Sequence, residues 1–178
     1  MPAMPMIRRL KTFLFERAIG KYRETNLSHV PENHFSAIRS IGILFEATDA
    51  ADREVVLAFA EQLRETGAEV WPLGFINSKV DGITFRFDFI DLTQLSFAWL
   101  PKGEHVRKFI ATPFDVLINL DTNTHRPLNY IAAASKALFK IGPAQGDHSH
   151  YDLMIEMQEK DVSRYIHEIR STFNKIQG

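Results

Sequence analysis

Polar side chains able to do chemistry follow the buried apolar segments of this 178-residue chain. Glu46 and Asp49 come after the apolar run SIGILF, and Asp121 comes directly after FDVLINL. Carboxylates that are brought together can act as a general acid and a general base. We therefore name Glu46, Asp49 and Asp121 as candidate catalytic residues. Four nearby polar residues are candidate ligand-binding residues: Thr48, Asn77, Asn123 and His125.

The same residue types also have an ordinary structural use. Asp, Asn, Ser and Thr side chains cap helices and bond to backbone groups in turns. Thr48 or Asp49 is well placed to cap the helix predicted after the first apolar run. The sequence leaves open whether each candidate meets a ligand or only stabilises a turn.

Cofactor motifs are missing from the chain. No G-x-G-x-x-G follows the first apolar run, and no G-x-x-x-x-G-K-[ST] occurs anywhere. The turn EATDAAD has no glycine and is acidic, so it would repel a phosphate. His148 and His150 lie two residues apart in a polar loop and are alternative metal ligands, because imidazole binds zinc and similar ions. An ordinary polar loop is the other interpretation, and we predict no cofactor and no metal.

Composition places the chain among globular proteins, with 45% apolar and 24% charged residues. The net charge of −1 indicates no general attraction to nucleic acid. Because there is no cysteine, disulfides, thiolate metal sites and cysteine nucleophiles are excluded. No segment approaches the roughly 18 apolar residues that span a bilayer, and no signal peptide is recognisable. We therefore expect a cytoplasmic protein.

Two apolar runs determine the predicted fold. Ile41–Phe45 and Phe114–Leu120 are almost uninterrupted, which indicates strands that are covered on both faces. Helical patterns separate the strands, so the sequence predicts an α/β three-layer sandwich with a Rossmann-like, mostly parallel sheet of about five or six strands. The two runs are predicted to lie side by side in its middle. Ligands of such sheets bind outside the carboxyl ends of the strands, where the candidate residues stand.

Three further features refine this prediction. Ile83–Ile90 alternates apolar and polar residues, which is typical of a strand with one wet face, and we expect an edge or antiparallel strand there. Pro72 indicates a bulge or an edge because it cannot donate to a strand partner. Gly142 and Pro143 are predicted to end a strand that begins near Leu138, and Leu138 also continues a helical stripe from Leu128.

Residues 1–35 are predicted to form a helix and a linker, followed by a single α/β domain over residues 36–178. From Met6 to Thr25 the helix has six basic and two acidic residues. Its predicted apolar side consists of Ile7, Leu10, Phe13, Leu14, Ile19 and Tyr22. Three interpretations are open: the helix docks on the core of its own domain, binds an acidic partner, or rests on a membrane surface.

Several motifs resemble known families. The segments IGILFEATDAADREVVLAF, FDVLINL, PLNYIAAASKALFKIGP and YDLMIE, within Ile38–Ile169, resemble a bacterial family of small proteins of unknown function. More distantly, FDVLINL and ALFKIG are similar to the N-terminal Rossmann-like domain of heptosyltransferase-type glycosyltransferases. That family has a Gly-Asp pair at the first strand–helix turn, where this chain has Arg53 and Glu54, and its sugar-nucleotide half has no counterpart here. The resemblance implies the fold without the activity.

Two functions remain open at this stage. The first is a non-catalytic binding or interaction module that acts as a homodimer or on a protein partner through its basic N-terminal helix. The alternative is a small enzyme or ligand-binding protein, sugar- or nucleotide-related, with its site at the strand carboxyl ends. A pocket with converging carboxylates at those ends would favour the alternative.

Overall fold

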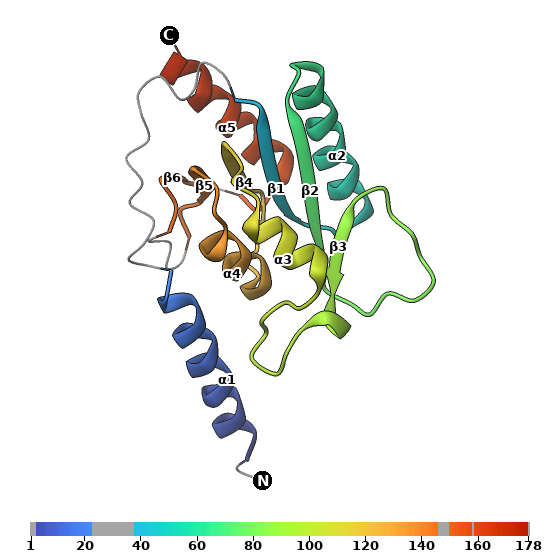
Figure 1. The fold of residues 1–178 in the computed structure, drawn as a ribbon, viewed down its shortest axis with the longest axis vertical. Helices are drawn as coiled ribbons and strands as arrows, with labels where there is room; N and C mark the ends of the chain where they lie inside the picture. The colour runs from blue at the N-terminus through green and yellow to red at the C-terminus, as the bar shows by residue number, and fades with distance from the viewer. Residues whose placement is uncertain (1–2, 23–37, 146–149, 158, 178) are drawn as a thin grey trace.

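The computed structural model describes residues 3–22, 38–145, 150–157 and 159–177 (Figure 1). Six strands form one sheet that is parallel throughout, in the order β3-β2-β1-β4-β5-β6. The strands are β1 (Ser40–Glu46), β2 (Glu69–Ile76), β3 (Asp88–Asp91), β4 (Val116–Asn119), β5 (Phe139–Pro143) and β6 (Leu153–Ile155). The helices are α1 (Ala3–Gly20), α2 (Ala50–Glu65), the short η2 (Leu92–Gln94), α3 (Glu104–Ala111), α4 (Arg126–Ala134) and α5 (Val162–Gln177).

The centre of the sheet is the predicted pair of strands. β1 and β4 run side by side in the same direction, with Ile41 opposite Val116 and Ile43 opposite Ile118. From β1 the chain builds outward to β2 and β3, and then returns to build β4, β5 and β6 on the other side. The strand order therefore reverses between β1 and β4, as it does in the Rossmann fold.

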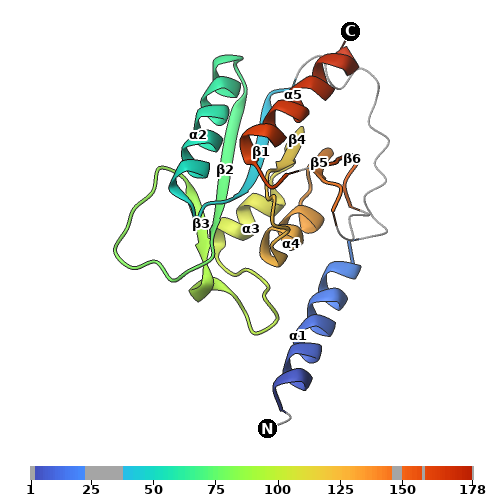
Figure 2. The ribbon, with the colours of Figure 1, turned by 180° about the vertical axis from the view of Figure 1, so that it is seen from behind.

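Helices cover both faces of the sheet, which confirms the predicted three-layer α/β sandwich. Helices α2 and α5 lie on one face, and α3 and α4 lie on the other (Figures 1 and 2). Neighbouring residues of a strand point to opposite faces. Accordingly Ile43 and Phe45 belong to the apolar cluster under α2 and α5, whereas Leu44 packs with Leu117 and Leu128 under α4. This double burial explains the uninterrupted apolar runs.

Pro72 lies where β2 is locally an edge. β3 pairs only with the second half of β2, Leu73 to Ile76, so Pro72 has a strand partner on the β1 side alone. The pairing with β1 is continuous through Pro72, so the predicted edge is correct and no bulge is needed. In the same part of β2, the Val70 carbonyl oxygen accepts a hydrogen bond from the Arg64 guanidinium at 2.8 Å. Both features limit pairing with a foreign strand.

The strand predicted over Ile83–Ile90 is wrong in extent. Only Asp88–Asp91 pairs with β2, as a parallel edge strand. The physical reason lies in Gly74 of β2: a Cβ there would be 2.6 Å from the Phe87 ring, so this ring occupies the face of the sheet above the glycine. Phe87 also packs against Phe45 at a ring distance of 5.2 Å. The aromatic residues preceding β3 therefore pack on a face of the sheet instead of extending its edge.

The boundaries of β5 agree with the prediction, whereas the end of the preceding helix differs from it. The strand begins at Phe139, and Gly142 and Pro143 are its last two residues. Gly142 is needed for packing, because a Cβ at this position would lie 2.4 Å from the Tyr151 ring. Helix α4 ends at Ala134, so Leu138 is outside it and exposed.

The N-terminal helix is present, but its predicted bounds are wrong, and most of its predicted apolar side does not dock on the core. It spans Ala3–Gly20 instead of Met6–Thr25, and residues 23–37, which include most of the predicted linker, lie outside the described part of the chain. Phe15 and Ile19 are its buried residues and pack with Ala133 of α4. Four residues of the predicted apolar side are exposed: Ile7, Leu10, Phe13 and Leu14. Both sides of the helix carry apolar residues, and the side with Phe15 is the one that meets α4.

Candidate functional site

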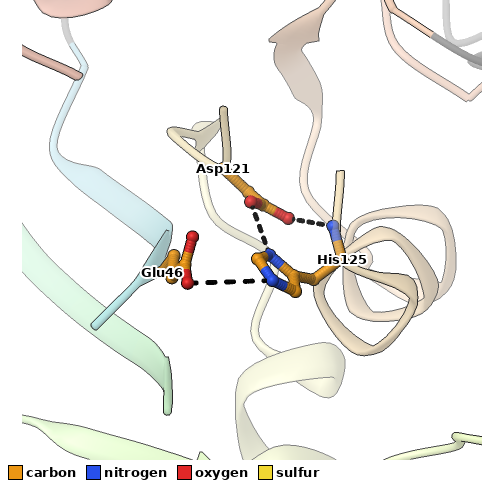
Figure 3. A group of neighbouring side chains, drawn as sticks. All are labelled: Glu46, Asp121 and His125. Atoms are coloured by element: carbon orange, nitrogen blue, oxygen red, sulfur yellow. Dashed lines mark hydrogen bonds and ion pairs between the residues drawn. The ribbon is translucent and has the colours of Figure 1, made fainter. Parts of the chain in front are cut away.

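The carboxyl ends of β1 and β4 bring together three of the candidate residues (Figure 3). Glu46 is the last residue of β1, and Asp121 follows two residues after the end of β4. His125 is the N-cap of α4. Because the strand order reverses between β1 and β4, this is the place where parallel sheets bind ligands.

Asp121 is the structural anchor of this group. Its side chain is fully buried, and both carboxylate oxygens accept hydrogen bonds. Oδ1 accepts from the backbone N–H of Asn123 at 3.0 Å and lies 2.9 Å from His125 Nδ1, while Oδ2 accepts from the backbone N–H of His125. The backbone N–H of Asp121 itself donates to Asn119 Oδ1 at 3.1 Å. The loop between β4 and α4 is thus folded around one carboxylate.

His125 is oriented by this carboxylate. A hydrogen bond from Nδ1 to Asp121 leaves Nε2 on the other side of the ring, 3.7 Å from Glu46 Oε1. The ring packs against Phe75 at 5.2 Å. Burial lowers the pKa of His125, but the hydrogen bond to Asp121 and the negative charges nearby outweigh burial, so the pKa is raised above its ordinary value.

The raised pKa of His125 predicts how stability depends on pH. The folded state holds the proton more tightly than the unfolded state, so this stabilisation is fully present below pH 6.5, the ordinary value, and is lost as pH rises through the folded pKa. We expect the free energy of unfolding to decrease over this interval in denaturant titrations. His125→Gln should remove the decrease, whereas His167→Gln, at an exposed histidine of α5, should leave it unchanged. An identical profile in the His125 variant would contradict the assignment.

Glu46 and Asn123 extend the group toward the surface. Glu46 Oε2 accepts from Asn123 Nδ2 at 2.6 Å, and Asn123 Oδ1 accepts from Lys160 Nζ at 3.1 Å. A chain of polar contacts therefore leads from the buried Asp121 through His125 and Glu46 to a lysine ammonium.

A divalent ion is one chemical possibility for this group. Glu46, Asp121 and His125 each offer a ligand atom, and these atoms lie within 4.8 Å of one another. However, both oxygens of Asp121 already accept hydrogen bonds, and the ammonium of Lys160 is held next to Glu46 through Asn123. The arrangement fits a proton relay better than a metal centre.

A cavity of about 680 Å3, called here the edge pocket, opens beside this group. The sheet contributes Phe75 and Asn77, and the start of α4 contributes His125. Helix α1 contributes Ile7, Arg8 and Lys11, and the first turn of α4 contributes Arg126 and Pro127. The loop after η2 contributes Trp99. Three cations therefore line a pocket whose walls are otherwise largely apolar.

Aromatic rings fix two of these cations. Lys11 Nζ lies 4.6 Å from the centre of the Phe97 ring and 5.6 Å from that of Trp99. The Arg126 guanidinium lies 5.4 Å from the ring of Phe15 and donates to Thr12 Oγ1 at 3.1 Å. These contacts tie α1 to the loop after η2 and to α4, so the pocket has a wall from each.

The other predicted residues have structural roles at the same sheet edge. Asp49 is the N-cap of α2 and accepts from the backbone N–H groups of Ala51 and Asp52 at 2.8 and 3.1 Å. Thr48 Oγ1 accepts from the backbone N–H of Asn77 at 2.9 Å and so joins the ends of β1 and β2. Asp49 therefore caps α2, which is the structural role that the sequence left open for it.

Of the two alternative metal ligands, His148 lies outside the described residues, and His150 is not part of the group. His150 is buried before β6, with its ring 4.2 Å from that of Tyr151.

The sequence did not identify most of the pocket walls. Of the residues that line the pocket, only Asn77 and His125 were among the candidates. A contact between α1 and the start of α4 has no signal in one sequence, because the residues are more than a hundred positions apart. Only Arg126, next to the candidate His125, could have been proposed from proximity.

A second cavity, of about 720 Å3, lies along the first half of β2, Glu69 to Pro72. None of the candidate site residues that the structure describes lines it. Its polar walls come from oppositely charged residues around a tryptophan: Arg64, Glu69, Trp71, Arg86 and Asp88.

Comparison with known proteins places the chain in a family. A family model matches residues 11–176, which is almost the whole chain. The chain belongs to a family of unknown function, DUF6913. This confirms the resemblance to a family of unknown function and extends it into α1. No curated protein and no solved structure matches the chain. Membership of this family assigns no reaction to the chain.

Proposed function

We propose that this protein binds a small anionic molecule with an apolar or aromatic part in the edge pocket, and that the Asp121–His125 pair exchanges a proton with it. The observation that carries this proposal is a histidine that a buried aspartate orients in the wall of a pocket at the reversal of strand order. This favours the ligand-binding alternative over a module that acts only through its surface.

The charge of the pocket supports an anionic ligand. Arg8, Lys11 and Arg126 line it, and the amino-terminal end of α4, where the helix dipole is positive, lies at the same place. The acidic turn after β1 begins with Glu46, which contacts His125 but is not among the residues that line the pocket. Asp49 in that turn bonds to the start of α2 and is not among the residues that line the pocket.

The walls support a ligand that is not purely polar. Phe75, Trp99 and Pro127 provide flat apolar surfaces on different elements of the fold. An anionic group against the cations and a ring or aliphatic part against these walls would use both kinds of surface. Nucleotides, sugar phosphates and aromatic carboxylates meet this description.

The proton chemistry follows from the geometry of the imidazole. Asp121 fixes Nδ1 as a donor, so Nε2, which lies 3.7 Å from Glu46 Oε1, is the nitrogen that would exchange a proton with a ligand. Its raised pKa increases the protonated fraction of His125 near neutrality, so His125 suits the role of a general acid or of a charged partner for an anion.

The test is a thermal-shift screen with nucleoside monophosphates, sugar phosphates and aromatic carboxylates. A ligand at about a hundred times its Kd should stabilise the folded protein by about 2.7 kcal/mol. Arg8→Gln should weaken the best ligand about tenfold, because it removes a charge-assisted contact. Arg9→Gln is the matched control: Arg9 is the next residue of α1, is exposed and is not among the residues that line the pocket.

The two variants separate pocket binding from general attraction. Equal weakening by Arg8→Gln and Arg9→Gln would show that the ligand responds only to the charge of α1. Binding that keeps the same pH dependence in His125→Gln would exclude the proton-exchange role of His125. A screen in which no anionic ligand raises the midpoint would contradict the proposed function.

A further inference from the structure

The outer side of α1 is an apolar stripe that the rest of the described protein leaves exposed. Phe15 and Ile19 face inward and are buried against α4. Leu10, Phe13 and Leu14 face outward, with 51%, 60% and 37% of their surfaces exposed. Their spacing of three and four residues places them on one side of the helix. In both views α1 lies at the margin of the molecule, beyond α4 (Figures 1 and 2).

Basic residues accompany this stripe. Arg9, Arg17 and Lys21 are exposed, and by helical spacing they lie on or beside the side that carries Leu10 and Phe13. From Ala3 to Tyr22 the sequence has five basic residues and one acidic residue. The outer side therefore combines exposed large apolar side chains with a clear excess of positive charge.

We propose that this outer side of α1, called the outer face, binds the surface of a membrane rich in anionic lipids, with the helix lying along it. Apolar side chains enter the boundary between headgroups and acyl chains, while arginine and lysine side chains bind the negatively charged headgroups. None of the described helices is long and apolar enough to cross a bilayer, so the contact is with the surface.

Charge complementarity favours this occupant over a second copy of the chain. Two outer faces packed against each other would bring Arg9, Arg17 and Lys21 of one copy close to the same cations of the other. Like charges in an apolar contact are costly, whereas an anionic lipid surface neutralises them. The proposal is independent of the edge pocket, because Arg8 and Lys11 line the pocket from the other side of the helix.

The test is flotation of the full chain with vesicles of phosphatidylcholine alone or of phosphatidylcholine and phosphatidylglycerol in equal parts. We expect binding to the anionic vesicles and little binding to the neutral ones. Phe13→Asp should reduce the partition coefficient at least tenfold. Its matched control is Ile83→Asp, because Ile83 has a similar exposed fraction, 58%, on a distant loop. Unchanged thermal midpoints in both variants would show that folding is intact.

Charge is tested separately. Arg17→Gln should weaken binding to the anionic vesicles about fivefold, as expected for one basic residue near such a surface. Arg107→Gln makes the same change in net charge at an exposed position of α3 and should have no effect. Absence of binding to anionic vesicles, or equal losses in the test and control variants, would overturn the proposal. So would a dimer in sedimentation experiments that Phe13→Asp dissociates while vesicle binding is unaffected.

Discussion

Asp121→Ala is expected to destabilise the protein by about 3 to 4 kcal/mol and to abolish proton exchange at His125. Asp121 is fully buried and accepts hydrogen bonds from the backbone N–H groups of Asn123 and His125 and from the imidazole. Alanine would leave these donors without their acceptor. It would also remove the hydrogen bond and the charge that raise the pKa of His125, so this pKa should fall.

The measurements are urea titrations for stability and an NMR titration of the imidazole for the pKa. Asp49→Ala is the matched control, because Asp49 caps α2 at the same sheet edge and is exposed. Loss of this cap should cost only about 1 kcal/mol and leave the pKa of His125 unchanged. Similar losses in both variants would show that Asp121 is no more than a turn residue.

The fold could be predicted because its dominant signal is local. An uninterrupted apolar run such as Ile41–Phe45 or Phe114–Leu120 indicates a strand covered on both faces, and helices between such runs leave few arrangements. The prediction over Ile83–Ile90 was wrong in extent because an alternating pattern does not show which parts of the fold the apolar side chains contact. Phe87 finds its place on the sheet above Gly74, a contact set by residues far apart in the sequence.

The candidate site could be predicted only in part, for a related reason. The rule that ligands bind at strand carboxyl ends located Glu46, Asp121 and His125, and the structure brings all three together. The same rule selected Asp49, because a capping carboxylate and a catalytic one look alike in sequence. The wall formed by α1 was missed, since both sides of this helix carry apolar residues and only the packing of Phe15 on α4 decides which side faces inward.

Lys140 is a buried charge that neither the sequence nor the proposed function explains. It lies in β5 opposite Leu117 of β4, and only 1% of its surface is exposed. Its Nζ donates to the carbonyl oxygen of Ala133, near the end of α4, at 3.2 Å. Burial lowers the pKa of Lys140 to about 8, although the negative charge of Asp152 acts in the opposite direction. The charged form of Lys140 is therefore less stable in the folded protein than in the unfolded chain.

This burial makes stability increase with pH in the alkaline range. The unfolded state binds more protons than the folded state between about pH 8 and the ordinary value of 10.5, so the free energy of unfolding should rise across this window. The full rise would be on the order of 3 kcal/mol. The opposite effect of buried tyrosines begins only above about pH 10, where tyrosine ionises in the unfolded chain. Urea titrations up to about pH 9.5 therefore isolate the lysine.

Lys140→Met should accordingly stabilise the protein by about 2 kcal/mol at neutral pH and flatten the profile above pH 8, because an apolar side chain of similar length replaces a poorly compensated charge. Lys136→Met, at an exposed lysine four residues earlier, should change neither quantity. A less stable Lys140→Met variant would mean that the hydrogen bond to Ala133 contributes more than the burial of the ammonium costs. In that case the main role of Lys140 would be to bind the Ala133 carbonyl oxygen at the end of α4, and its low pKa would be a consequence of that position.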